Sequence, residues 1–187
     1  AQDSKLFVIS GPSGAGKGTL VTRVRERRSN LGLTVSATTR APRKGEVDGV
    51  NYFFLTREEF DRRVANGEFV EWAEVHGNCY GTLVSEVTSK LASGSSLILE
   101  IDVQGALQVK ERFPEAVLIF IKPPSLEVLR ERLVGRGTET PETIELRMAN
   151  AADELALADR YDDVVVNDDL DRATDELVRV LDMHERI

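Results

Sequence analysis

The chain has 187 residues, of which 41% are hydrophobic and 30% are charged, and its formal net charge is −8. This balance predicts one globular domain and argues against a general nucleic-acid binder, which should carry a broad basic face. The longest apolar runs, residues 6–9 and 116–121, are far shorter than the roughly 20 residues of a membrane span. We therefore expect neither nucleic acid nor membrane as a partner.

Two features bear on the cellular compartment. Cys79 is the only cysteine and cannot form an internal disulfide, which is typical of a protein of the reducing cytoplasm. No long apolar run follows the first charged residues, so no secretory signal is expected at the start. We predict a cytoplasmic protein.

The charge is unevenly distributed. Residues 153–187 hold twelve acidic and four basic side chains, whereas residues 23–44 hold seven basic side chains and one acidic. A basic segment in an acidic protein suggests a small anionic ligand. For residues 23–28 we favour the alternative of a solvated helix face, because such charge runs are usually exposed.

The predicted elements alternate between strand and helix. Residues 6–10 form a β-rich run that ends in a Gly-rich turn, and a helical pattern follows over residues 17–29. Further buried-strand patterns cover residues 96–101, 116–121 and 163–166, and further helical patterns cover residues 84–92, 103–113, 126–134, 141–158 and 170–185. This alternation indicates an α/β fold with a parallel sheet that has helices on both faces.

Two stretches interrupt the alternation. Residues 36–83 contain short strand-like pieces and many turns, which predicts a mixed α/β insertion. Residues 127–155 read as a helix, a Gly-rich turn and a second helix with interspersed arginines, as expected of a mobile lid. The predicted core then consists of residues 1–35, 84–126 and 156–187.

The Gly-rich turn matches a phosphate-binding loop. Its sequence fits the first seven positions of G-x-x-x-x-G-K-[ST] between a strand and a helix, with the residues Gly11, Pro12, Ser13, Gly14, Ala15, Gly16 and Lys17. Backbone N–H groups and the helix N-terminus can surround phosphate oxygens, and Lys17 can reach the β- and γ-phosphates. A Gly-rich turn without a ligand is the alternative, which the flanking elements disfavour.

The loop departs from the motif at one position. Gly18 replaces the usual Ser or Thr, so no hydroxyl at this position can bind magnesium directly, and Thr19 is the next candidate for a phosphate contact. The variant Gly-Lys-Gly-Thr also resembles adenylate kinases, so the loop alone does not select a nucleotide.

Further motifs resemble those of guanylate kinases along nearly the whole chain. They are SATTRAPR at residues 36–43, GEVDG at 45–49 with Tyr52, FVEWA at 69–73, GNCYGT at 77–82, LEIDVQG at 99–105, GRGTE at 135–139 and NDD at 167–169. The resemblance implies a P-loop nucleoside-monophosphate kinase fold. It also implies magnesium-dependent transfer of a phosphoryl group from ATP to GMP or dGMP.

Glu71 is the predicted reader of guanine. A carboxylate can accept from both N1–H and the 2-amino group, a donor pair that adenine lacks. On a strand over residues 69–75, simple alternation puts Glu71 on one face with Phe69, Ala73 and Val75. The alternative is an edge charge that points at water. The resemblance adds Ser36, Gly81 and Thr82 as further contacts to the base.

The phosphate of GMP needs cations and hydroxyls. Arg40 and Arg43 follow a Thr-Thr pair and are separated by Pro42, and planar guanidinium groups suit phosphate oxygens. The resemblance adds the hydroxyls of Tyr52 and Tyr80. The alternatives are surface ion pairs for the arginines and packing roles for the tyrosines.

Glu100 and Asp102 are expected to end a buried strand on the same face as Ile98, where ligands of open α/β sheets bind. Their predicted roles are to order magnesium-bound water and to contact the guanine amino group, without an assignment between the two. Magnesium is expected to be held by ATP oxygens and water, with Thr19, Glu100 and Asp102 as candidate neighbours and no direct ligand assigned.

The lid is predicted to supply arginines to the ATP phosphates. Arg132 and Arg136 share a helix face if the helix continues through Gly135, and Arg147 comes from the second helix. The resemblance assigns Arg136 and Arg147 to the transferring group, so that the predicted catalytic residues are Lys17, Arg43, Arg136 and Arg147. Ordinary surface helices are the alternative.

Two residues and two rival functions complete the predictions. Asn167 and Asp168 follow the last strand and are expected to bound the adenine pocket. One rival is a catalytically inactive guanylate-kinase-like binding module, against which Lys17 and the arginines argue. The other is a kinase for a different nucleotide.

Overall fold

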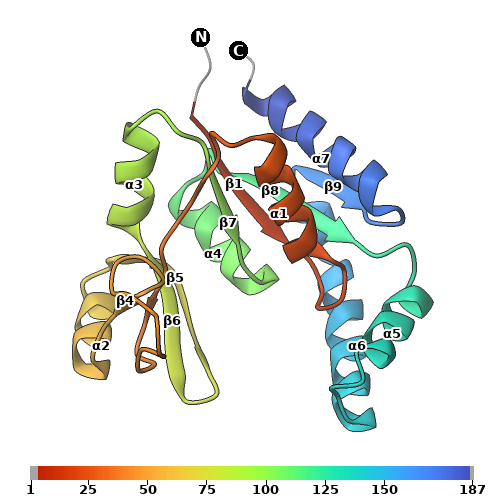
Figure 1. Cartoon of the computed structure of the whole chain (residues 1–187), viewed down its shortest axis with the longest axis horizontal. Helices are drawn as coiled ribbons and strands as arrows, with labels where there is room; N and C mark the ends of the chain where they lie inside the picture. Colours follow the sequence, from red (N-terminus) through yellow and green to blue (C-terminus); the bar gives the residue numbers. More distant parts are fainter. Residues whose placement is uncertain (1–3, 186–187) are drawn as a thin grey trace.

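The computed structural model describes residues 4–185 and contains two sheets (Figure 1). The larger sheet consists of β1 (Leu6–Ser10), β2 (Gly32–Leu33), β7 (Leu97–Glu100), β8 (Val117–Lys122) and β9 (Asp163–Val166). Its order is β2-β7-β1-β8-β9, and all of its neighbouring strands pair in parallel. The predicted parallel sheet is confirmed, although the two-residue strand β2 was not predicted.

Helices cover both faces of this sheet, because its central strands are apolar on both sides. In β1, Phe7 and Ile9 pack toward α1 (Lys17–Arg27) and α7 (Leu170–Glu185). Leu6 and Val8 pack toward α3 (Val84–Ala92) and α4 (Val103–Arg112) on the other face.

The basic segment after residue 22 pairs with the acidic end of the chain. Across the α1–α7 contact, Arg23 pairs with Asp171, Arg27 with Asp175, and Arg28 with Asp182 and Glu185. Arg23 and Arg27 nevertheless stay partly exposed, so the favoured solvated helix face is confirmed for them, with acidic partners on α7 that were not predicted. The two segments of opposite charge lie about 150 residues apart in sequence and meet in the fold.

The insertion forms a small mixed sheet of its own (Figure 1). Its strands are β3 (Ala37–Thr38), β4 (Phe53–Phe54), β5 (Phe69–Val75) and β6 (Asn78–Leu83), in the order β4-β3-β6-β5. The helix α2 (Arg57–Ala65) begins at Thr56, whose hydroxyl caps it by accepting from the Glu59 N–H. Buried Phe60 of α2 packs against Phe69 and Cys79 of the sheet.

A β-bulge in β5 corrects the predicted face of Glu71. The register with β6 shifts between Phe69 and Glu71, so β5 contains an extra residue there. The ring of Phe60 lies near both Phe69 (centroids 4.4 Å apart) and Trp72 (6.2 Å apart). Phe69 and Trp72 thus share the face of the insertion core, and Glu71 does not lie on the same face as Phe69.

The lid segment is a pair of helices, α5 (Leu126–Gly135) and α6 (Pro141–Leu155), followed by the short 3-10 helix η1 (Ala158–Arg160). Leu129 and Leu133 of α5 pack against Ile144 and Ala151 of α6 in a cluster of their own. No helix within residues 4–185 is long and apolar enough to cross a membrane.

Candidate functional site

The phosphate loop joins β1 to α1 and is closed by its own lysine. Gly14 and Gly16 have φ of 90° and 85°, which a residue with a β-carbon rarely adopts. The Lys17 Nζ donates to the Gly11 carbonyl oxygen at 2.8 Å. The ammonium has three donors, so two remain for other partners.

Asn167 donates a hydrogen bond to the loop and thereby supports its conformation. Its buried amide donates to the Ala15 carbonyl at 2.8 Å, and a β-carbon on Gly16 would come within 2.4 Å of the same nitrogen. Arg132 of α5 donates to the Asn167 carbonyl at 2.9 Å and to the Gly14 carbonyl at 3.4 Å. The Asn167 amide, which was predicted to bound the adenine pocket, is therefore already bonded within the loop.

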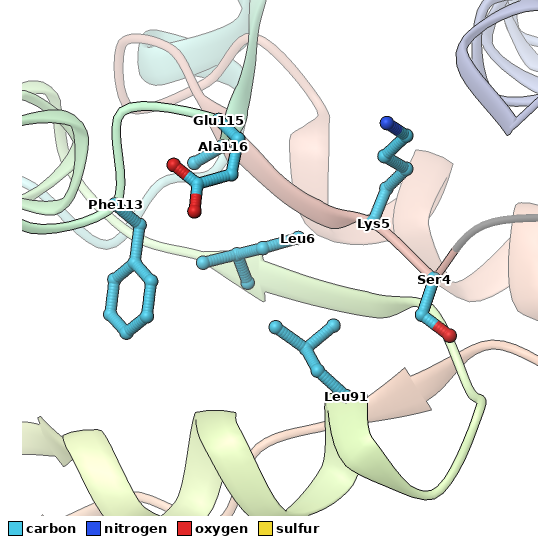
Figure 2. A pocket seen from close by; sticks show the side chains of 7 residues that line it. All are labelled: Ser4, Lys5, Leu6, Leu91, Phe113, Glu115 and Ala116. Atoms are coloured by element: carbon cyan, nitrogen blue, oxygen red, sulfur yellow. The ribbon is translucent and has the colours of Figure 1, made fainter.

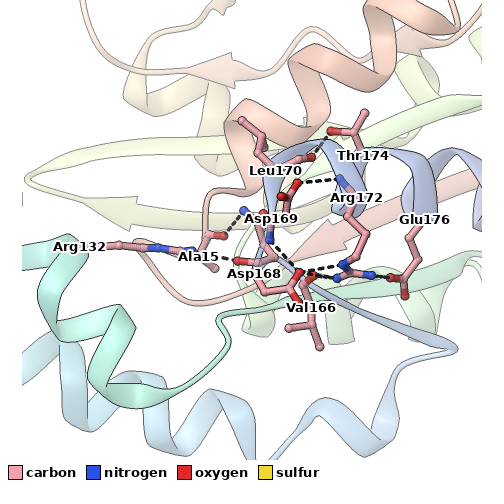
Figure 3. A network of polar contacts seen from close by, with 10 residues as sticks. Ala15, Arg132, Val166, Asp168, Asp169, Leu170, Arg172, Thr174 and Glu176 are labelled. Carbon is pink, nitrogen blue, oxygen red and sulfur yellow. Dashed lines mark hydrogen bonds and ion pairs between the residues drawn. The ribbon is translucent and has the colours of Figure 1, made fainter.

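Asp168 belongs to a network at the start of α7 (Figure 3). Its Oδ1 accepts from Arg172 Nε at 2.8 Å, and Arg172 also donates to Glu176 and to the Val166 carbonyl. Arg172, and after it the Asp169 N–H, hold the pKa of Asp168 below its ordinary value. Asp168 is thus an ionised surface carboxylate beside the residue that supports the loop.

The predicted lid arginines are not all at the loop. Arg147 Nη1 donates to Ser13 Oγ at 3.0 Å, and Arg147 Nε lies 2.8 Å from Glu139 Oε1. Arg136 follows the end of α5 in helical conformation and is exposed, and its side chain makes no hydrogen bond or ion pair within residues 4–185. Arg132 and Arg147 therefore contact the phosphate loop, whereas Arg136 does not.

In the insertion, Arg40 is fixed by a residue that the sequence reasoning missed. Its two terminal nitrogens donate to both carboxylate oxygens of Glu46, at 2.9 and 3.0 Å. The guanidinium lies 5.1 Å from the centre of the Tyr52 ring, and that ring is 6.2 Å from the ring of Tyr80. Glu46 raises the pKa of Arg40 above its already high value, so Arg40 is a permanent cation. The other two predicted phosphate contacts, Tyr52 and Tyr80, lie beside it.

Glu46 also organises the turn that carries Arg43. Its Oε1 accepts from the Arg43 N–H at 2.7 Å, while the Arg43 side chain is exposed and makes no bond within residues 4–185. The Arg40 side chain, and after it the Arg43 N–H, lower the pKa of Glu46. The acidic residue three positions after Arg43 was the available signal for this role.

Glu71 is bonded within the site and does not point at bulk water. Thr82, fully buried on β6, donates its hydroxyl to Glu71 Oε1 at 2.8 Å. A β-carbon on Gly105 would lie 3.5 Å from Glu71 Oε2, which brings the carboxylate to the first turn of α4. Burial, and to a smaller degree the Asp102 charge, raise the pKa of Glu71, while the Thr82 bond opposes this shift.

Two other residues predicted to contact guanine flank this pair. Gly81 precedes Thr82 on β6, and a β-carbon there would come within 2.8 Å of the Glu71 carbonyl oxygen. The half-buried Ser36 accepts at its backbone carbonyl from Phe53, and its hydroxyl makes no bond within the part of the chain that the structure describes.

Glu100 lies on the α1 side of β7, as Ile98 does and as predicted, whereas Asp102 does not belong to the strand. The strand β7 ends at Glu100, whereas Asp102 lies beyond it and caps α4 by accepting from the Gly105 N–H at 2.7 Å. The exposed Glu100 carboxylate is next to the start of α1, since a β-carbon on Gly18 would lie 3.4 Å from its Oε1. Gly18 leaves this space to the carboxylate.

Of two hollows in the structure, one adjoins the predicted site residues and the other does not. The first, about 160 Å³, is lined by Leu6, Leu91 and Phe113 at the start of β1, the opposite end from the phosphate loop (Figure 2). The second, about 300 Å³, is lined by Asp102, Val103, Gln104, Asn150, Asp153 and Glu154. Only the second adjoins the predicted site, and its lid residues were not among the sequence predictions.

Comparison with known proteins gives one consistent result. The family model described as guanylate kinase matches residues 3–184. The chain is 57% identical to the guanylate kinase of Gloeobacter violaceus over 95% of this chain and 87% of that protein, and 53% identical to that of Halalkalibacterium halodurans over 94% and 86%. The crystal structure of guanylate kinase from Anaplasma phagocytophilum matches with a TM-score of 0.74 and 36% identity, over 100% of this chain and 89% of that one.

Proposed function

The chain belongs to the guanylate kinase family and is an ATP:GMP phosphotransferase, and we propose that it divides this work between the phosphate loop and the insertion. The observation that carries the proposal is the Glu71–Thr82 pair at the first turn of α4. It offers guanine a carboxylate that is held in place before the substrate arrives. In this division, residues 36–83 bind the acceptor and residues 127–155 act as the lid.

On the donor side, the loop residues 11–19 bind the triphosphate of ATP. The positive φ of Gly14 and Gly16 turns backbone N–H groups inward, and the N-terminus of α1 adds partial positive charge. Lys17 keeps donors that its bond to Gly11 does not use, and these can reach the triphosphate. Asn167 and Asp168 lie at the edge where adenine would bind.

On the acceptor side, Glu71 accepts from guanine N1–H and the 2-amino group, and Ser36, Gly81 and Thr82 complete the base contacts. The base of adenine has no such donor pair, so its binding would leave the buried carboxylate without partners. Arg40, Arg43, Tyr52 and Tyr80 bind the phosphate of GMP or dGMP. Glu46 accepts from both terminal nitrogens of Arg40 and so fixes its guanidinium group.

Magnesium fits the oxygen donors beside the loop. Thr19 is in the first turn of α1, and Glu100 at the end of β7 lies beside Gly18. Both offer the hard oxygen ligands, direct or through water, that this ion prefers. Within residues 4–185 no group of three or more His, Cys, Asp or Glu is arranged to hold a metal by itself. The ion would supply charge neutralisation at the transferring phosphoryl group, and Asp102 would contact the guanine amino group or a water of the ion.

The lid supplies the remaining positive charge. Phosphoryl transfer spreads negative charge over the equatorial oxygens, and fixed cations lower that barrier without a strong general base. Arg132 and Arg147 already contact the loop, and closure of the lid would bring Arg136 to the same phosphates. The buried thiol of Cys79, the only cysteine, agrees with action in the cytoplasm.

The test is an acceptor panel with the purified protein. ATP and magnesium are supplied with GMP, dGMP or AMP, and ADP formation is followed. We expect turnover with GMP and dGMP and a kcat/KM for AMP at least 1,000-fold lower, as a site built to bond a donor pair should give. Equal use of AMP would refute the assignment of Glu71, and failure of ATP to bind in a calorimetric titration would refute the donor site.

A further inference from the structure

The hollow of about 300 Å³ connects the base of the lid with the carboxyl edge of the core sheet. Asp102, Val103 and Gln104 line it from the start of α4, and Asn150, Asp153 and Glu154 line it from the last turns of α6. The two acidic residues of α6 differ in their environment. Asp153 is exposed, whereas Glu154 is half-buried and near Lys17 and Asp102.

Glu154 shares a helix face with the lid arginine that contacts the loop. Arg147, Ala151 and Glu154 are spaced four and three residues apart, which aligns them along one side of α6. Ala151 is fully buried, and Arg147 donates to Ser13 of the phosphate loop at 3.0 Å. This face of α6 is therefore the one that meets the loop.

The carboxylate of Glu154 lacks a partner although its surroundings offer two donors. Its side chain makes no hydrogen bond or ion pair within residues 4–185, and burial raises its pKa while the charge of Lys17 opposes the rise. Among the residues that the structure describes, the hydroxyl of Tyr161, a residue only 8% exposed, also has no hydrogen-bond partner, and it lies near Ser10, Glu154 and Asp102. Lys17 itself spends one donor on Gly11 and keeps two.

We propose that Glu154 is a positioning residue for Lys17. Its carboxylate accepts one of the free Lys17 donors and the Tyr161 hydroxyl when the lid closes, and it thereby fixes the direction in which the last donor meets the triphosphate. The Gly11 carbonyl oxygen, the Glu154 carboxylate and the triphosphate then accept from the three donors of the Lys17 ammonium, which leaves it little freedom at the moment of transfer. The inference rests on the proposed role of Lys17 in binding the phosphates of ATP.

The inference also implies a pH dependence. Glu154 must be ionised to accept from Lys17, so turnover should fall as the pH falls through its pKa, which burial raises. The groups that face it are Lys17, Asp102, Tyr161 and the neighbouring Asp153.

The experiment compares Glu154→Gln with the matched variant Asp153→Asn, which removes the adjacent charge from the same hollow. We expect E154Q to lower kcat at least fivefold, to leave the KM for GMP within twofold, and to flatten the acidic limb of the kcat profile. D153N should change kcat less than twofold and keep the limb, and E154D, which retains the charge, should recover part of the loss. Thermal unfolding of each variant shows whether the fold is kept.

Three outcomes would overturn the inference. They are an E154Q enzyme with normal kcat and an unchanged acidic limb, an equal loss in D153N, and a loss that follows lowered thermal stability in E154Q and E154D alike. Lys17→Ala, measured alongside, separates this failure from that of the proposed function. If K17A is impaired and E154Q is not, only the role of Glu154 fails, whereas a normal K17A would remove the donor site itself.

Discussion

In the proposed function, the phosphate loop and the insertion recognise their ligands in different ways. The loop uses backbone groups, and side chains from distant elements, Asn167 and Arg132, donate to its carbonyl oxygens and hold its conformation. The insertion uses side chains, which hold one another: Glu46 holds Arg40, and Thr82 holds Glu71. A site made of backbone groups should keep its binding when most side chains around it are substituted. A binding side chain that is oriented by one partner should lose its position when that partner is substituted.

The largest predicted effect tests the single essential side chain of the loop. In Lys17→Ala, the triphosphate loses the only charged group that the loop itself provides, and we expect kcat to fall by about 10²- to 10³-fold, the range found when one preorganised donor is removed. GMP affinity, measured by calorimetry, should stay within twofold. A GMP affinity that falls in parallel with turnover would contradict the separation of the two regions.

Thr82→Val should have the next largest effect, because the change keeps the shape of a buried residue and removes the donor to Glu71. The carboxylate then lacks its fixed partner, and we expect kcat/KM for GMP to fall about 30-fold, with a loss of about 1–3 kcal/mol in the free energy of unfolding. Thr82→Ser retains the hydroxyl and is the matched control. Equal kinetics for the Val and Ser variants would show that the hydroxyl has no part in holding Glu71.

The smallest of these effects concerns the partner of Arg40. Glu46→Gln keeps the size of the side chain but replaces one acceptor oxygen by a donor, so the bidentate contact is lost. We expect the KM for GMP to rise about tenfold while the preference for GMP over AMP stays unchanged, because the base contacts are intact. Glu58→Gln, in an exposed acidic residue of α2, serves as the control. A change in base preference would show that Glu46 acts beyond the phosphate.

The contrast between the contiguous phosphate loop and the side-chain contacts of the insertion also explains what could be predicted from the sequence. The phosphate loop was predicted because its seven residues are contiguous and lie between a strand and a helix. The common face of Glu71 with Ala73 and Val75 was predicted correctly, but its common face with Phe69 was predicted wrongly, because a bulge after Phe69 breaks the alternation and nothing in residues 69–75 signals it.

Pairings between distant residues were also missed. The acidic residues of α7 that neutralise Arg23 and Arg27 lie 148 positions away, so the sequence predicted a solvated helix face there without these ion pairs. The support of the loop by Asn167 is of the same kind, since 152 positions separate it from Ala15. A contiguous motif predicts a site that is made of backbone groups. Contacts between side chains that are distant in sequence become visible only in the folded structure.

The ratio of kcat/KM for GMP to that for AMP in Glu71→Gln, with ATP affinity measured on the same protein, tests the central claim most directly. The amide keeps one acceptor and presents a donor where guanine also donates, so we expect the ratio to fall at least 100-fold while ATP binds as in the parent protein. An unchanged ratio would show that Glu71 does not read the base, and the assignment of the insertion as the guanine site would be wrong.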